Sequence, residues 1–167
     1  MNIDFTNFWE SNFYNHPALT EKMVSIAERK LEIKLPESLI KLLFVMNGGY
    51  TNPYAFPMDV PTSWAENHIP LDSINGIILD KSVESPFDLL DLIKALAGVP
   101  DFPKDVVPFS GNAHTFICLD YRKNSTPTIC WIDLEMDDDI YVADTFDEFL
   151  EGLVSQDVYE EDDEDDY

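Results

Sequence analysis

The order of hydrophobic and polar residues predicts helices in the first two thirds of the chain and strands in the last third. Apolar residues recur at i, i+3 and i+4 over residues 4–13 and again over residues 20–31, which is the spacing of one face of an amphipathic helix. In the first stretch this face is aromatic, and Thr20 is a suitable N-cap for the second. We therefore expect a short aromatic helix at 4–13 and a capped helix at 20–31.

The stretch LPESLIKLLFVMNGGY, residues 35–50, has the start and the stop of a helix. Pro36 suits the first turn, because its missing N–H would be unpaired there in any case. Apolar residues cover so much of the helix surface that we expect it to be largely buried. Asn47 and Gly48 reach left-handed dihedral angles cheaply, so they should end the helix, and Gly49 should then redirect the backbone.

Residues 50–68 contain three prolines and no clear period, so we expect an irregular surface loop with aromatic anchors. Long irregular loops inside compact domains are often functional. The pattern that follows predicts a strand at residues 77–80. Residues 85–98, SPFDLLDLIKALAG, then predict a helix that is capped by Ser85 and ends at Gly98.

The last third consists of short runs of β-branched and aromatic residues separated by turn residues, which is the pattern of strands. The runs are VVPFSG, TFICLDY, PTICWID and IYVAD. Between the second and third, RKNSTP predicts a hairpin loop, and pairing Asp120 with Thr128 would place Cys118 opposite Cys130. Both of these strands are apolar on both faces, so they should be central and covered. A capping box at the start of residues 145–153 predicts a last helix.

Charge narrows the classes of partner. The chain of 167 residues has 33 acids and 10 bases, a formal net charge of −23, and eight of the acids lie in residues 157–167. Without those eight the formal charge is still about −15. Such a field repels nucleic acid and anionic membranes and attracts cationic proteins, although it also serves solubility. We expect one folded domain at residues 1–153, followed by an acidic tail at 154–167 without fixed structure.

Targeting signals and metal motifs are not apparent in the sequence. The first ten residues, MNIDFTNFWE, have acids where a secretory signal has bases, and no apolar run approaches the length of a membrane span. Cys118 and Cys130 form no C-x-x-C pair and have no zinc-site spacing with histidine. The expected compartment is therefore the cytoplasm, with both thiols reduced.

The motifs of common enzyme classes are also not apparent. His16, His68 and His114 are scattered, and the chain contains no nucleophile elbow, phosphate-binding loop or dinucleotide fingerprint. We therefore expect no catalytic residues and no cofactor. A small-molecule pocket between helices and a sheet stays open as an alternative.

A calcium loop is the sharpest metal hypothesis. Asp133, Glu135 and Asp137 alternate as at the beginning of an EF-hand loop. The sixth position, however, is Asp138 where the loop needs glycine, and the twelfth is Asp144 where it needs glutamate. The expectation is that no metal binds there.

Four stretches occur in a recognisable order: LEIKLPESLIKLLFVMNGG, VVPFSGNAHTFICLDY, PTICWIDLE and VADTFDEFLEGL. Together they resemble the SUKH superfamily, in particular its Smi/Knr-like branch, over roughly residues 20–153. The resemblance implies an α+β domain with a twisted, mainly antiparallel sheet and surrounding helices. It also implies a role without catalysis, because bacterial members look like immunity proteins that bind and neutralise toxins, and fungal relatives act as regulators and interaction hubs.

The resemblance also suggests that many toxins of such systems are nucleases or other nucleic-acid enzymes, and a nuclease needs a basic cleft to hold phosphate. An acidic protein can occupy that cleft and compete with the substrate. Alternating acids would share one face of a strand if the strand continued through residues 133–137, and the turn after it would extend the patch. Aromatic residues of the expected loop would be the anchors. The predicted partner-binding residues are Tyr50, Tyr54, Trp64, Asp133, Glu135, Asp137, Asp138 and Asp139.

The predicted function is therefore an immunity protein that blocks a basic cognate toxin domain by direct contact in the bacterial cytoplasm. A regulatory interaction scaffold without catalysis is the first alternative. A ligand-binding protein or an unrecognised enzyme is the second. The sequence leaves the oligomeric state open.

Overall fold

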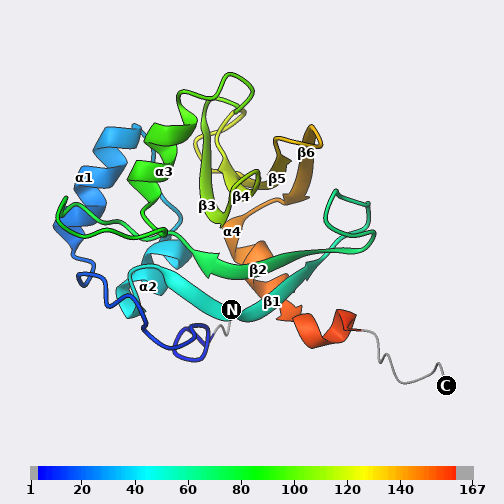
Figure 1. Cartoon of the computed structure of the whole chain (residues 1–167), viewed down its shortest axis with the longest axis horizontal. Coiled ribbons are helices and arrows are strands. Elements are labelled where there is room, and N and C mark those ends of the chain that lie inside the picture. The colour runs from blue at the N-terminus through cyan, green and yellow to red at the C-terminus, as the bar shows by residue number, and fades with distance from the viewer. Residues whose placement is uncertain (1–3, 161–167) are drawn as a thin grey trace.

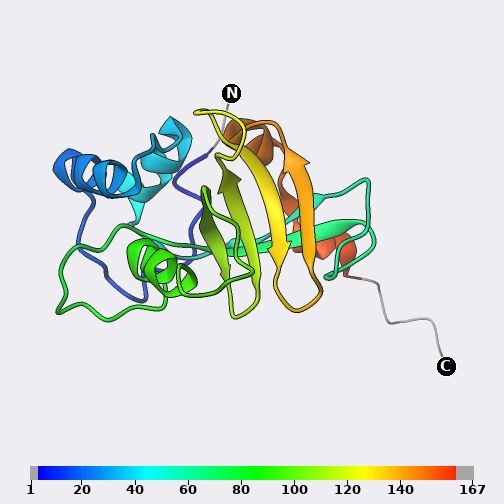
Figure 2. The same cartoon turned by 90° about the horizontal axis from the view of Figure 1, so that it is seen from above.

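Two antiparallel β-sheets form the centre of the fold, and helices lie around them (Figures 1 and 2). The computed structural model describes residues 4–160. One sheet has the strand order β2-β1-β7 and the other β3-β4-β5-β6. The expected α+β class is confirmed, although the strands are divided between two sheets.

The first sheet contains β1 (Gly49–Pro57), β2 (His68–Ile74) and β7 (Val154–Ser155), and the second contains β3 (Val106–Asn112), β4 (Thr115–Asp120), β5 (Thr128–Asp133) and β6 (Asp138–Ala143). The helices are α1 (Glu21–Leu31), α2 (Glu37–Val45), α3 (Leu89–Leu96), α4 (Phe146–Gly152) and the short 3-10 helix η1 (Gln156–Tyr159). Figure 2 shows α1, α2 and α3 on one side of the second sheet, with β6 at the far edge.

The second sheet follows the sequence prediction closely. β4 pairs with β5 in the expected register, with Asp120 opposite Thr128 and Cys118 opposite Cys130. Both strands are buried along most of their length, as their apolar pattern predicted. One face of this sheet packs into the main core, and the other packs in a smaller cluster with Leu96 of α3.

Helix capping also follows the prediction at both ends of the domain. The Thr20 hydroxyl accepts the Met23 amide at the start of α1, and the Thr145 hydroxyl accepts the Glu148 amide at the start of α4. α2 begins directly after Pro36. Only one side of α2 is buried, and Phe44 on the other side is exposed, so the helix is less buried than its apolar composition predicted.

The expected helix at residues 4–13 is wrong. Residues 5–8 form bends, and the chain then pairs with β1 through a bridge between Trp9 and Thr51 and a bond of 3.0 Å from the Asn52 amide to the Phe8 carbonyl. Phe8 and Trp9 are buried in the main core all the same. Pairing with β1 satisfies the backbone here, so the aromatic spacing reflects core packing and not a helical period.

The expected loop at residues 50–68 is wrong over its first half. Residues 50–57 belong to β1, and only residues 58–67 form the connection to β2. A register irregularity between Tyr50 and Tyr54 accommodates the first proline, which is the kind of position where strands tolerate proline. The strand expected at 77–80 does not form, because β2 already ends at Ile74.

Three further boundaries differ from the prediction. α3 begins at Leu89, and its N-cap is Asp88, which lies three residues after the predicted cap Ser85. Asn47 does not adopt a positive φ, and Gly48 and Gly49 do so instead. Residues 154–159, which we expected inside the unstructured tail, form β7 and η1, and β7 pairs with β1. Residues 161–167 of that tail lie outside the described part of the chain.

Candidate interaction surface

The loop between β1 and β2 lies against the turn between β5 and β6. The Ser63 amide donates to Oδ2 of Asp138 at 2.7 Å, and Nε1 of Trp131 donates to the Ser63 hydroxyl at 3.3 Å. These bonds bring Trp64, which is 56% exposed, next to the acidic turn. Two groups of predicted contact residues, far apart in the sequence, therefore meet on one surface. We call it the acidic hairpin surface, formed by residues 58–67 and 133–141.

Asp133 is the structural base of this surface. It is 2% exposed, and its Oδ1 lies 3.0 Å from Nδ1 of His114 and accepts the amides of Glu135 and Met136 at 2.9 and 3.1 Å. Burial opposes ionisation, but hydrogen bonds from Ser63, His114 and these amides outweigh it and lower the pKa of Asp133 to about 2. Asp133 is thus an ionised internal acceptor that shapes the turn, and its prediction as a contact residue is not supported by its burial.

The alternating acids do not share one strand face. β5 ends at Asp133 and β6 begins at Asp138, so the intervening residues form a tight turn. Asp137 has a φ of 57°, the left-handed conformation that Asp tolerates better than most residues. The turn projects Glu135, Met136 and Asp137, all of which are exposed.

Asp139 is already paired. Its carboxylate accepts Nη1 of Arg122 at 2.6 Å and Nη2 at 2.9 Å, and the same guanidinium binds Asp120 through Nε at 2.9 Å. The hydrogen bonds to Asp139 and then Asp120 raise the pKa of Arg122. Asp139 therefore contributes less to the outward field than its unpaired neighbours in the turn.

Two of the predicted aromatic anchors lie elsewhere. Tyr50 belongs to an aromatic cluster, with its ring centroid 6.0 Å from that of Tyr14 and 5.0 Å from that of Phe87. Tyr54 stacks on Phe8 with a centroid distance of 5.3 Å, beside the N-terminal segment. Of the three predicted anchors, only Trp64 lies on the acidic hairpin surface.

Two exposed apolar side chains of the acidic hairpin surface were missed by sequence reasoning. Met136 is 66% exposed at the tip of the turn, and Tyr141 is 58% exposed on β6. The hydroxyl of Tyr141 donates to the Asp144 carboxylate, and this bond raises the pKa of Tyr141 to about 12. Both lie where a strand was expected to continue, so the pattern gave no sign that they face solvent.

The charges of the molecule are segregated. All ten lysine and arginine residues lie within residues 22–41 and 81–123, and neither 42–80 nor 124–167 contains one. The two base-free stretches supply β1, β2, β5, β6 and α4, including the whole acidic hairpin surface. The helices α1 and α3, which lie on the other side of the second sheet in Figure 2, fall in the stretches that contain bases. The gap in lysine and arginine is the sequence signal that marks this surface.

His114 is the titratable cation of the acidic hairpin surface. Its Nδ1 faces Asp133, and its Nε2 lies 3.5 Å from Oε2 of Glu135. The hydrogen bond with Asp133 raises the pKa of His114 against the effect of burial, and the charge of Glu135 adds to the rise. Ser63, His114 and Asp133 lie together, but the Nε2 atom that a hydrolase would use as a base faces a carboxylate. The arrangement therefore stabilises the turn between β5 and β6.

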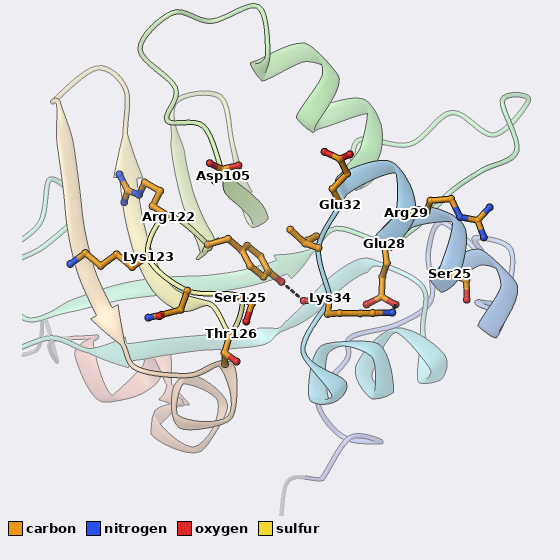
Figure 3. Close-up of a pocket in the computed structure, with 13 residues that line it drawn as sticks. Ser25, Glu28, Arg29, Glu32, Lys34, Asp105, Arg122, Lys123, Ser125 and Thr126 are labelled. Carbon is orange, nitrogen blue, oxygen red and sulfur yellow. Dashed lines mark hydrogen bonds and ion pairs between the residues drawn. The ribbon is translucent and has the colours of Figure 1, made fainter.

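A second candidate site is an open cleft of about 1150 Å³ between the C-terminal end of α1 and the loop that joins β4 to β5 (Figure 3). The Tyr121 hydroxyl donates to the Lys34 carbonyl at 2.6 Å and closes the floor of the cleft. Figure 3 shows Glu28 and Arg29 on the α1 side and Arg122 and Lys123 on the loop side. Glutamates and an arginine line the α1 side and two cations the loop side, so the cleft has no convergent polar set for one class of ligand.

Within residues 4–160, three or more potential metal ligands nowhere gather in a group that could hold an ion, and Asp133, the first residue of the EF-hand-like run, is used internally. A helix long and apolar enough to cross a membrane is likewise not found in that range.

Over most of its length the chain is similar to a known protein family. The model of the SMI1 / KNR4 family (SUKH-1) matches residues 18–152, which include both sheets apart from β7 and all four α-helices. Curated proteins give no match. The matched range includes the whole acidic hairpin surface.

Proposed function

Because the chain belongs to the SMI1 / KNR4 family (SUKH-1), which is associated with immunity proteins, we propose that it neutralises a cognate toxin by binding it directly. The family assignment made from the sequence is thereby confirmed. The observation that carries the proposal is the acidic hairpin surface, where exposed Trp64 and Met136 lie among acids, residues 58–67 and 133–141 contain no lysine or arginine, and Arg122 pairs with Asp139 at its edge. In this proposal the protein acts in the cytoplasm of a bacterium that makes the toxin.

The composition of this surface favours a basic protein partner. Interface centres are enriched in tryptophan and methionine, and they are commonly surrounded by polar residues. A dense negative field speeds the encounter with a cationic protein and repels nucleic acid. A nuclease toxin, whose cleft must bind phosphate, has the matching charge.

Exposure supports a narrower contact set. Glu135 and Asp137 are exposed acids of the turn, and in this proposal exposed Trp64 and Met136 serve as its apolar anchors. Asp138 remains at the rim, where it also holds the Ser63 amide. The remaining predicted contacts, Asp133, Asp139, Tyr50 and Tyr54, take part in internal pairing or lie away from the surface.

The test is protection against a toxin encoded next to this protein's gene. Cells that express the toxin should grow when the protein is co-expressed and should stop growing with the variant Glu135→Lys/Asp137→Asn. The asparagine retains a residue that tolerates the left-handed conformation at 137. The matched control is Glu84→Lys/Asp101→Asn, which makes the same charge change at two exposed residues outside the surface.

Two results contradict the proposal. One is that the neighbouring gene product is harmless or is not neutralised by this protein. The other is that the surface variant and the control protect equally well. A regulatory scaffold would use the same surface, but it would bind several cellular proteins and would give no protection against a toxin.

A further inference from the structure

Strand β6 forms the outer edge of the second sheet. The strand order is β3-β4-β5-β6, and within residues 4–160 only β5 pairs with β6. The opposite edge, β3, lies beside β2, where the Ser110 hydroxyl donates to the Ser73 carbonyl at 2.6 Å. An uncovered edge presents unpaired N–H and C=O groups, which another extended chain can bind.

The direction of the backbone groups along β5 follows from one bond. The Leu134 amide donates to the His114 carbonyl at 2.8 Å, so position 134 faces β4. Backbone groups point alternately to the two sides of a strand, and therefore Asp133 and Trp131 face β6.

The register then identifies the free groups of β6. Asp133 and Trp131 are paired with Asp138 and Ile140, whose backbone groups thus bond to β5. By the same alternation the N–H and C=O groups of Asp139 and Tyr141 point away from the sheet. The outward backbone groups of these two residues have the spacing with which one strand binds the next, so a further strand can pair with them.

Side chains next to these free groups are held in place. Asp139 is fixed by Arg122, and Tyr141 is fixed by its bond to Asp144. At the start of the strand, the bond from Ser63 to Asp138 brings Trp64 close. An arriving segment therefore finds an ordered edge with an aromatic side chain near each end, which lowers the entropic cost of binding.

Charge decides which kind of segment fits. Residues 124–160 contain no lysine or arginine, and among the described residues the one cation bound to β6 is Arg122, which pairs with Asp139. A second copy of β6 along this edge would therefore bring the carboxylates of Asp138 and Asp144 close to like charges. An extended segment with lysine or arginine at alternate positions meets these two carboxylates as opposite charges instead. An alternative interpretation is that the acids serve only to prevent two copies of this edge from pairing. That role would not require exposed aromatic residues beside the edge.

We propose that β6 is the docking edge for an extended, lysine- or arginine-rich segment of the partner, which adds to the second sheet as a fifth strand. The inference rests on the proposed function insofar as the segment would belong to the toxin. It specifies how the acidic hairpin surface is used, through backbone bonds at Asp139 and Tyr141 as well as through side chains.

The test uses the whole protein labelled with ¹⁵N and the capped peptide Lys-Val-Lys-Val-Lys-Val-Lys. Hydrogen exchange of the Asp139 and Tyr141 amides should be fast in the free protein and should slow by at least about tenfold at saturating peptide. The peptide Lys-Pro-Lys-Pro-Lys-Pro-Lys has the same charge but cannot pair as a strand, and it should leave both amides unprotected. The peptide with glutamate in place of lysine should not bind.

Variants of the protein provide a second readout. Tyr141→Pro removes an outward donor that β5 does not use, so it should abolish protection at Asp139, with circular dichroism to check the fold. Tyr141→Ala keeps the donor and should retain the slowed exchange at Asp139, although it binds more weakly. Should the proline variant not fold, the comparison of the two lysine peptides still decides the question.

The inference is overturned if the Lys-Val peptide leaves the two amides unprotected, or if the Lys-Pro peptide protects them equally. Because these assays contain no toxin, they separate the two proposals. Protection of cells with no binding of the Lys-Val peptide at β6 overturns the edge alone. Binding at β6 with no toxin neutralised overturns the proposed function alone.

Discussion

The side chain of Asn47 forms two hydrogen bonds with the backbone of Ile77. Its Nδ2 donates to the Ile77 carbonyl at 2.7 Å, and its Oδ1 accepts the Ile77 N–H at 2.9 Å. Nδ2 also donates to the Pro17 carbonyl at 2.9 Å. The Asn-Gly-Gly stop thus joins the end of α2 to two distant segments, and Gly48 allows this approach because a Cβ atom there would lie 2.4 Å from the nitrogen of Gly76.

Replacing Asn47 with alanine should lower the free energy of unfolding by about 2–4 kcal/mol, because buried backbone groups lose their partners. Urea unfolding followed by circular dichroism measures this change. Asn124→Ala, in the exposed loop between β4 and β5, is the control and should change stability by less than about 0.5 kcal/mol. Equal stability of the two variants would contradict the structural role of Asn47.

Stability at acid pH should depend on Asp133. Its folded pKa of about 2 lies below the ordinary aspartate value of 3.8, so its contribution is present above about pH 4 and is lost as the pH falls toward 2. The loss should be on the order of 2 kcal/mol. Urea unfolding at pH 5 and at pH 2.5 measures it, and Asp133→Asn should remove most of this part of the pH dependence. An unchanged profile in that variant would refute the assignment.

His114 should act in the opposite direction. Its pKa is raised in the folded protein, so its contribution is present below its ordinary value of 6.5 and is lost as the pH rises through the folded value. The ion pair with Asp133 is therefore complete between about pH 4 and pH 6.5. An NMR titration of the imidazole should give a pKa above 6.5 in the wild type and a lower value in Asp133→Asn. A pKa that does not fall in this variant would show that Asp133 does not cause the shift.

Arg122→Ala should raise the pKa of Asp120. Asp120 is partly buried, which opposes its ionisation, and the bonds from Arg122 keep its pKa below the ordinary value. Removal of the guanidinium leaves burial without this compensation. A carboxyl NMR titration measures the change, with Lys123→Ala as the neighbouring control. If both variants shift the Asp120 pKa equally, the effect is general charge and not the hydrogen-bonded pair.

Trp64→Ala should weaken binding of the cognate toxin by at least about 30-fold, as expected for a tryptophan at the centre of an interface. The free energy of unfolding should change little, because the side chain is mostly exposed. Calorimetric titration with the toxin measures the affinity. Phe13→Ala removes an exposed aromatic side chain outside the acidic hairpin surface and should bind normally. Equal affinity of the two variants would exclude Trp64 as an anchor.

The sequence was sufficient to predict those elements for which the local capping and turn residues agree with the period of the apolar residues. β3 to β6 were found from short β-branched runs, and the register of Cys118 opposite Cys130 followed from the loop that joins their strands. The caps at Thr20 and Thr145 are local hydrogen bonds, which depend on neighbouring residues alone. The net charge and its segregation are also properties of the sequence.

Only the tertiary structure decided the N-terminal segment and the first sheet. The aromatic residues of 4–13, which include Phe8 and Trp9, have helical spacing. Their backbone nevertheless forms hydrogen bonds with β1, because a short isolated helix is only marginally stable. The site was decided in the same way, because the contact between Ser63 and Asp138 joins two loops 75 residues apart. Which acids face solvent depends on that packing and on where β5 ends, and neither is encoded in the spacing of the acids themselves.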